Sequence, residues 1–138
     1  MTLGEGMKKI LVADVPQMDA RYQAAAAGWE LAFARTTTQA CHALASSPFD
    51  LVAVGVYFDD SRMFDLVRAI RGDPDIEDLP IVCVRGRPGF TAVTGRTLEM
   101  TLKALGADEF VDLVHFGDDA SGQAALRATI ERLLLPQG

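Results

Sequence analysis

The hydrophobic residues of this chain fall into five short apolar runs, and polar residues gather between them. The longest run is Phe49 to Val56, which is apolar at every position except Asp50 and Gly55. A nearly continuous apolar run of this length is typical of a strand that is buried on both faces of a parallel sheet. The same reasoning predicts the other strands at 10–13, 29–35, 79–84 and 109–113.

Between the runs, apolar residues recur at three- and four-residue spacing, as they do on one face of a helix. Met63, Phe64, Val67 and Ile70 have this spacing. We expect helices over 16–27, 39–46 and 62–71, a fourth that ends near residue 105, and a fifth that ends at residue 135. Five alternating strand–helix pairs predict an α/β fold, a flavodoxin-like three-layer sandwich around a five-stranded parallel sheet of order 2-1-3-4-5.

Length and charge limit what the chain can be. Its 138 residues suit one domain, which we place at 8–135, between a flexible leader at 1–7 and a tail at 136–138. The net charge of −6 disfavours nucleic acid, which binds to a basic face. No apolar run has the length of a membrane span. Cys41 and Cys83 lie in apolar patterns that indicate buried free thiols, and no secretion signal is evident, so we expect a cytoplasmic protein.

The chemistry of a parallel sheet is expected at the carboxyl ends of its strands. Asp14 follows the first predicted strand, Gly55 stands near the end of the third, and Arg85 follows the fourth. Asp59 and Asp60 lie on the loop after the third strand. We therefore expect these five residues to share a pocket. Its central position, Gly55, has no side chain with which to attack a substrate or to bind a metal.

Five segments of the chain resemble the receiver (CheY-like) domain of bacterial response regulators. They are Lys8–Val12, Asp50–Val54, Leu66–Arg71, Leu79–Val82 and Gly106–Phe110, and the resemblance extends over about residues 8–135. It implies a two-component signalling domain in which an aspartate at the end of the third strand accepts a phosphoryl group. It also implies acidic Mg²⁺ ligands after the first strand, a Thr or Ser after the fourth and a Lys after the fifth.

The chain departs from that pattern at the positions that carry the chemistry. The acceptor position is Gly55, the hydroxyl position is Arg85 and the lysine position is Leu113, and of the acidic residues only Asp14 remains. We interpret the chain as a degenerate pseudo-receiver that is not an enzyme and uses no metal or cofactor. Extra residues are expected in the segment Gly86–Thr97.

Two alternatives concern single acidic residues. Asp14 could pair with the Arg85 guanidinium in the space of the lost metal and phosphoryl group, or Arg85 could point into solvent. Asp59 or Asp60 could be a displaced phosphoryl acceptor. Otherwise both belong to a solvated loop, with Asp60 or Ser61 capping the helix over 62–71.

Another alternative is a small-anion or nucleotide site. Arg62, Arg85, Arg87 and Arg96 could gather at one edge of the sheet and bind such a ligand, although scattered solvated arginines fit the sequence as well.

The resemblance implies a protein partner, such as a histidine kinase or another signalling protein. We expect phosphorylation-independent binding by a stand-alone adaptor through its fourth helix, fifth strand and fifth helix. Phe110 stands where receivers carry a switch aromatic. The leucines at 133–135 could leave apolar surface for a homodimer.

Overall fold

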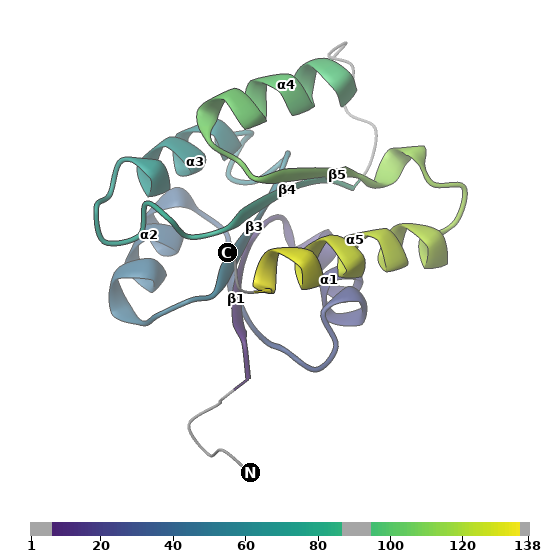
Figure 1. The fold of residues 1–138 in the computed structure, drawn as a ribbon, viewed down its shortest axis with the longest axis horizontal. Coiled ribbons are helices and arrows are strands. Elements are labelled where there is room, and N and C mark those ends of the chain that lie inside the picture. Colours follow the sequence, from purple (N-terminus) through teal and green to yellow (C-terminus); the bar gives the residue numbers. More distant parts are fainter. Residues whose placement is uncertain (1–6, 87–94, 136–138) are drawn as a thin grey trace.

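The computed structural model describes residues 7–86 and 95–135, which form a five-stranded parallel sheet with helices around it (Figure 1). The strand order is β2-β1-β3-β4-β5, which confirms the predicted topology. The strands are β1 (Lys9–Ala13), β2 (Glu30–Ala34), β3 (Leu51–Gly55), β4 (Ile81–Arg85) and β5 (Glu109–Asp112).

Three predictions concern residues outside the described ranges. The tail at 136–138, all of the leader except Met7, and positions 87–94 of the long segment Gly86–Thr97 lie there. The domain limits of 8–135 therefore stay a prediction.

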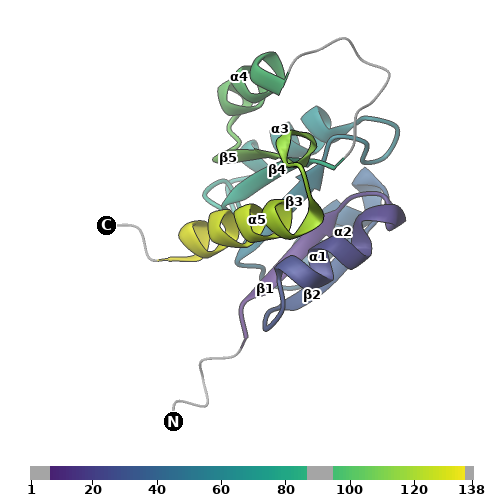
Figure 2. The same ribbon diagram turned by 90° about the vertical axis from the view of Figure 1, so that its right-hand side faces the viewer.

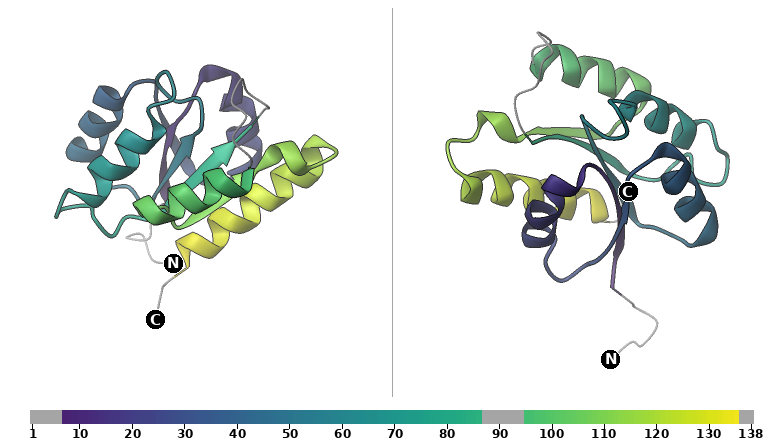
Figure 3. Two further views of the ribbon diagram at one scale, coloured as in Figure 1. Left: turned by 90° about the horizontal axis from the view of Figure 1, so that it is seen from above. Right: turned by 180° about the vertical axis from the view of Figure 1, so that it is seen from behind.

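Helices cover both faces of the sheet. Figures 2 and 3 show α1 (Asp19–Ala25) and α5 (Asp119–Leu134) together on one face. The opposite face carries α2 (Thr37–Ser46), α3 (Met63–Arg71) and α4 (Gly95–Leu105). Two short 3₁₀ turns, Pro16–Met18 and Leu113–His115, precede α1 and follow β5.

Alternation along the central strands builds two separate cores. In β3, Val52 and Val54 pack towards α2, α3 and α4, whereas Leu51 and Ala53 pack towards α1 and α5. Successive side chains of a strand point to opposite faces, so a strand that is apolar at every position can supply both cores. All five residues of β3 are buried, as the apolar run predicted.

Some details differ from the sequence-based expectations. The first helix is shorter than 16–27, because its first turn is 3₁₀ and it ends at Ala25. The fifth strand ends at Asp112 rather than Leu113, where the Asp112 side chain accepts a hydrogen bond from the backbone N–H of Val114 and starts a turn.

The two cysteines also differ from each other. Cys83 is buried in β4 as predicted. The prediction for Cys41 is wrong: it is exposed on α2, since Ala40 and Leu44 face the core there.

No helix in the described part of the chain is both long and apolar enough to cross a bilayer.

Candidate functional site

Three strands bring their predicted site residues to one edge of the sheet. Asp14 directly follows β1, Gly55 ends β3 and Arg85 ends β4, and the strands are parallel neighbours in that order. The predicted convergence at the carboxyl edge is therefore present. The side chains do not form one pocket, however, because they leave the sheet on different faces.

Asp14 is a buried carboxylate on the face that carries α1 and α5. Only 3% of the residue is exposed. Its Oδ2 accepts a hydrogen bond of 2.7 Å from the hydroxyl of Tyr22, and its Oδ1 accepts one of 2.7 Å from the backbone N–H of Val15. Burial raises the Asp14 pKa from 3.8 to about 6, against the lowering effect of those two hydrogen bonds.

Gly55 is glycine because the Asp14 carboxylate occupies the space beside it. A Cβ atom on residue 55 would overlap the carboxylate carbon and both carboxylate oxygens of Asp14. The volume in which an acceptor side chain would begin is therefore filled by Asp14 itself. The sequence shows a glycine at position 55, but the cause of the glycine is visible only in the packing.

Arg85 pairs with Asp112, and the hypothesis of an Asp14–Arg85 pair is wrong. The Arg85 Nε donates to Asp112 Oδ1 at 3.0 Å and its Nη2 donates to Asp112 Oδ2. The two side chains are only 13% and 7% exposed, so the alternative of a solvent-directed Arg85 is wrong as well. The hydrogen bonds to Asp112 raise the pKa of the Arg85 guanidinium above its ordinary value.

Sheet geometry explains this choice of partner. Arg85 and Asp112 are opposite each other in the register of β4 and β5, so their side chains lie on the same face. Cys83, two residues before Arg85, belongs to the core under α2, α3 and α4, whereas Val12, two residues before Asp14, belongs to the core under α1 and α5. Arg85 and Asp14 therefore stand on opposite faces of the sheet.

At the carboxyl edge, the described residues form no group of ligands for Mg²⁺. Asp14 is followed by Val15 and preceded by Ala13, and both of its oxygens already accept hydrogen bonds. Within residues 7–86 and 95–135, no three His, Cys, Asp or Glu side chains are grouped so that they could hold a metal ion. The described residues thus hold no ready-made cluster of protein oxygen ligands at this edge.

The loop after β3 has an unusual backbone. Asp59, Asp60 and Ser61 have φ angles of 46°, 55° and 66°, three consecutive left-handed residues that are not glycine. Such residues carry conformational strain, which Asp tolerates better than most. The residue at the N-cap of α3 is Arg62, without a side-chain cap, so the predicted capping by Asp60 or Ser61 is wrong.

Asp59 has a structural role that its sequence position did not reveal. Its Oδ2 accepts hydrogen bonds from the backbone N–H of Thr37 at 2.9 Å and from the Thr37 hydroxyl at 3.0 Å. The backbone N–H bond lowers the Asp59 pKa below its ordinary value. The carboxylate thus satisfies a free N–H at the start of α2, beside the Thr36 hydroxyl, which caps the N–H of Gln39.

We expect the substitution Asp59→Ala to lower the free energy of unfolding and to speed amide exchange in the first turn of α2. Asp60→Ala is the matched control, because Asp60 has the same left-handed backbone but an exposed side chain, and the hydrogen bonds from Thr37 go to Asp59 instead. Chemical denaturation and hydrogen exchange measure both effects. Equal losses in the two variants would contradict the capping role.

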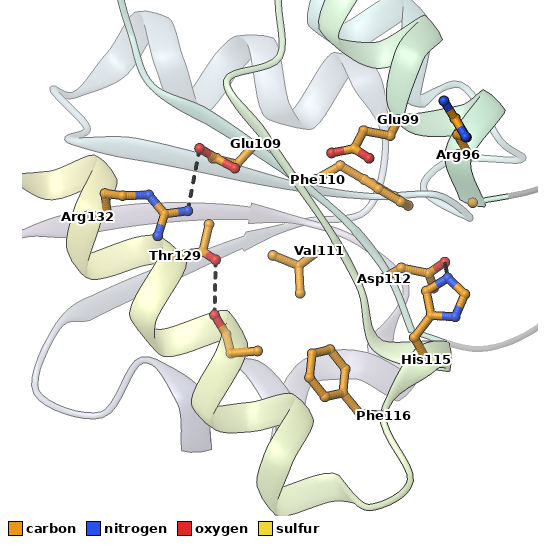
Figure 4. Close-up of a pocket in the computed structure, with 12 residues that line it drawn as sticks. Arg96, Glu99, Glu109, Phe110, Val111, Asp112, His115, Phe116, Thr129 and Arg132 are labelled. Atoms are coloured by element: carbon orange, nitrogen blue, oxygen red, sulfur yellow. Dashed lines mark hydrogen bonds and ion pairs between the residues drawn. The ribbon is translucent and has the colours of Figure 1, made fainter.

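The face formed by α4, β5 and α5 contains a cavity of about 490 Å³ (Figure 4). Phe110, at the switch-aromatic position, is half-buried, packs against the core under α4 and lines this cavity. Glu109 and Arg132 form an ion pair of 3.4 Å across its wall, and His115 lies 3.2 Å from Asp112. Phe116 is 38% exposed on the same face.

The alternative of an arginine-edged anion site finds no support in the described residues. Arg85 is taken up by Asp112, Arg62 and Arg96 are exposed, and Arg87 lies outside the described ranges. Leu113, at the lysine position, is buried in the core under α1 and α5.

Comparison with known proteins identifies the fold. No protein-family model matches the chain. No curated protein sequence matches it either. Solved structures do: the chemotaxis response regulator CheY4 of Vibrio cholerae has a TM-score of 0.72 at 21% identity, covering 93% of this chain and 99% of that one.

Two further response regulators are similar. The phosphorylated cyanobacterial phytochrome response regulator RcpA has a TM-score of 0.74 at 15% identity and covers 94% of this chain and 95% of its own. A response regulator from Thermotoga maritima has a TM-score of 0.71 at 17% identity, and the match covers 94% of this chain and 98% of that one. The resemblance to receiver domains is thereby confirmed at the level of the fold.

Proposed function

We propose that this protein is a pseudo-receiver, a signalling module that binds a protein partner without being phosphorylated and without catalysing a reaction. The observation that carries the proposal is the Asp14 carboxylate beside Gly55, because it fills the space of the acceptor side chain. The hydrogen bonds of Asp14 to Tyr22 and Val15 hold it there. A single buried carboxylate with both oxygens engaged can neither attack phosphorus nor complete a metal site.

The partner is proposed to bind the face of α4, β5 and α5. The support is its shape and chemistry: a cavity of about 490 Å³ beside an edge strand, with Phe110 and Phe116 among acidic and basic side chains. Aromatic anchors surrounded by charged groups are typical of protein interfaces. The Arg85–Asp112 pair ties β4 to β5 under this face, so the surface is held in one arrangement with no phosphoryl group present.

The competing function is that of a phosphorelay receiver with a displaced phosphoryl acceptor. Asp59 is the first of its two candidate acceptors. Transfer of a phosphoryl group to Oδ2 of Asp59 would form an O–P bond on the oxygen that accepts two hydrogen bonds from Thr37, and transfer to either oxygen would remove the carboxylate charge, so phosphorylation would weaken the start of α2. Asp60 is exposed, but among the described residues the ion pairs of Lys9 and Lys103 are with Glu30 and Glu99, and no metal-ligating cluster is present. These contacts favour the pseudo-receiver.

An amide NMR titration with Mg²⁺ and beryllofluoride, which mimics an acyl phosphate, tests the missing phosphoryl site. We expect no shifts beyond a control with Mg²⁺ and fluoride alone. Saturable shifts at Gly55, Asp59, Asp60 and Arg85 together would overturn the proposal. Asp59→Asn and Asp60→Asn would then identify the acceptor.

Titration of the labelled protein with a histidine kinase of the same organism tests the partner face. Shifts should map to α4, β5 and α5 and should be the same with and without ATP. Shifts that appear only with ATP would show dependence on phosphorylation.

A further inference from the structure

A second cavity lies at the opposite edge of the sheet, where β3 and β4 begin. Its volume is about 250 Å³. The α2–β3 segment forms one wall and the α3–β4 segment forms the other. We call it the amino-edge groove, and its apolar lining consists of Leu44, Pro48, Phe49, Pro74, Ile76 and Leu79.

The rim of the amino-edge groove is acidic. Asp75, Glu77 and Asp78 line it, and Asp73 is adjacent; all four are exposed. Among residues 7–86 and 95–135, no lysine, arginine or histidine forms an ion pair with any of these carboxylates. Lys9, which contacts the lining residue Phe49, has its ammonium 3.9 Å from Glu30 rather than on the rim. Within the described part of the chain, the rim therefore carries carboxylates that no side-chain cation pairs with.

Arg71 holds the α3–β4 wall in place through hydrogen bonds to backbone carbonyls. Its Nη1 donates to the carbonyl oxygens of Glu77 at 2.8 Å and Leu79 at 2.7 Å, and its Nε donates to that of Gly106 at 2.8 Å. Successive turns complete the wall, with the Ile76 N–H bonded to the Asp73 carbonyl at 3.0 Å. The charge of Arg71 is balanced by an ion pair with Asp108 at 3.0 Å, and Arg71 forms no ion pair with a rim carboxylate.

The α2–β3 wall is fixed as well. The Lys9 ammonium donates to the Ser47 hydroxyl at 3.1 Å and lies 4.8 Å from the centre of the Phe49 ring. The Asp50 carboxylate accepts a hydrogen bond of 2.8 Å from the backbone N–H of Lys9. Both walls are thus held before any partner arrives, which reduces the ordering cost of binding.

We propose that the amino-edge groove binds a basic segment of a protein partner, in which an apolar side chain enters the groove between lysine or arginine residues. Charge complementarity selects this occupant: the floor accepts an aliphatic group, and the four rim carboxylates attract flanking cations. A second copy of this chain, with its net charge of −6, lacks the charge that the rim requires. The groove lies away from the face of α4, β5 and α5, so one domain can hold two partners at once.

The test uses a short fluorescein-labelled peptide of alternating lysine and leucine, measured by fluorescence anisotropy. We expect saturable binding that weakens with added salt. One control peptide carries glutamate in place of lysine and another carries serine in place of leucine; neither should bind. The combined variant Asp75→Asn, Glu77→Gln, Asp78→Asn should weaken binding about tenfold or more.

The matched control variant is Asp60→Asn, Asp65→Asn, Glu131→Gln, which changes the net charge equally at exposed carboxylates elsewhere. It should bind as the parent does, and equal weakening in both variants would overturn the proposal. Amide shifts give a second readout that is independent of the variants. They should centre on Phe49, Ile76 and Leu79, and shifts centred on α4, β5 and α5 would also overturn it.

Discussion

Replacing Gly55 with alanine should lower the free energy of unfolding by about 1–3 kcal/mol, the range for added volume in a packed interior. The new Cβ would overlap the Asp14 carboxylate, which cannot move freely because Tyr22 and Val15 hold it. At an unobstructed strand position the same change would be neutral or stabilising, since alanine loses less backbone entropy than glycine. Chemical denaturation at neutral pH measures the effect.

A double-mutant cycle isolates the cause. In an Asp14→Ala background the obstructing carboxylate is gone, so Gly55→Ala should then cost little or nothing. An equal cost in both backgrounds would place the obstruction elsewhere. The cycle bears directly on the proposed function, because an acceptor at position 55 must begin with the same Cβ atom.

The second large effect is a dependence of stability on the ionisation of Asp14. Its pKa is about 6 in the folded protein against 3.8 ordinarily, so the folded state binds the proton more tightly than the unfolded chain does. Proton binding to Asp14 therefore stabilises the folded state. This stabilisation is fully present below pH 3.8 and is lost as the pH rises through 6. The loss amounts to about 3 kcal/mol at 1.36 kcal/mol per pKa unit.

Asp14→Asn tests this linkage. The variant should be more stable than the parent at pH 8, by up to about 3 kcal/mol, and the difference should vanish towards pH 4. Comparison of the two proteins across pH removes the contributions of the other carboxylates. Asp60→Asn, at an exposed position, should show no such trend. A difference between Asp14→Asn and parent that does not change between pH 4 and 8 would contradict the raised pKa.

Tyr22 influences the pH at which the stabilisation by protonated Asp14 is lost. Its hydroxyl bond at 2.7 Å favours the ionised carboxylate of Asp14 and lowers its pKa. Tyr22→Phe should therefore move the loss of stability to higher pH, which the same denaturation series would reveal. The buried pair of Asp14 and Tyr22 links the carboxyl edge of the sheet to α1, so the carboxylate at this edge is part of the core.

The sequence determined the architecture of this protein. Apolar runs such as Leu51–Gly55 and the helical spacing from Met63 to Ile70 were sufficient to predict the five strands, the layers and the order of the sheet. These features depend on local periodicity and on the short connections of parallel strand–helix units, which a single sequence records directly. The sequence also indicated the residues that stand at the acceptor, hydroxyl and lysine positions.

The partners of those residues were decided by the tertiary structure. Register and side-chain alternation put Asp14 and Arg85 on opposite faces of the sheet and set Arg85 against Asp112. The contact of Asp59 with Thr37 joins residues 22 positions apart. It depends on a left-handed turn at Asp59, for which the sequence contains no recognisable motif. A one-residue difference in register reverses the face of every side chain, and a strand such as β3, which is apolar and buried at every position, has no alternation in its sequence from which to read that face. Which charges meet, and why residue 55 must be glycine, therefore follow only from the packed fold.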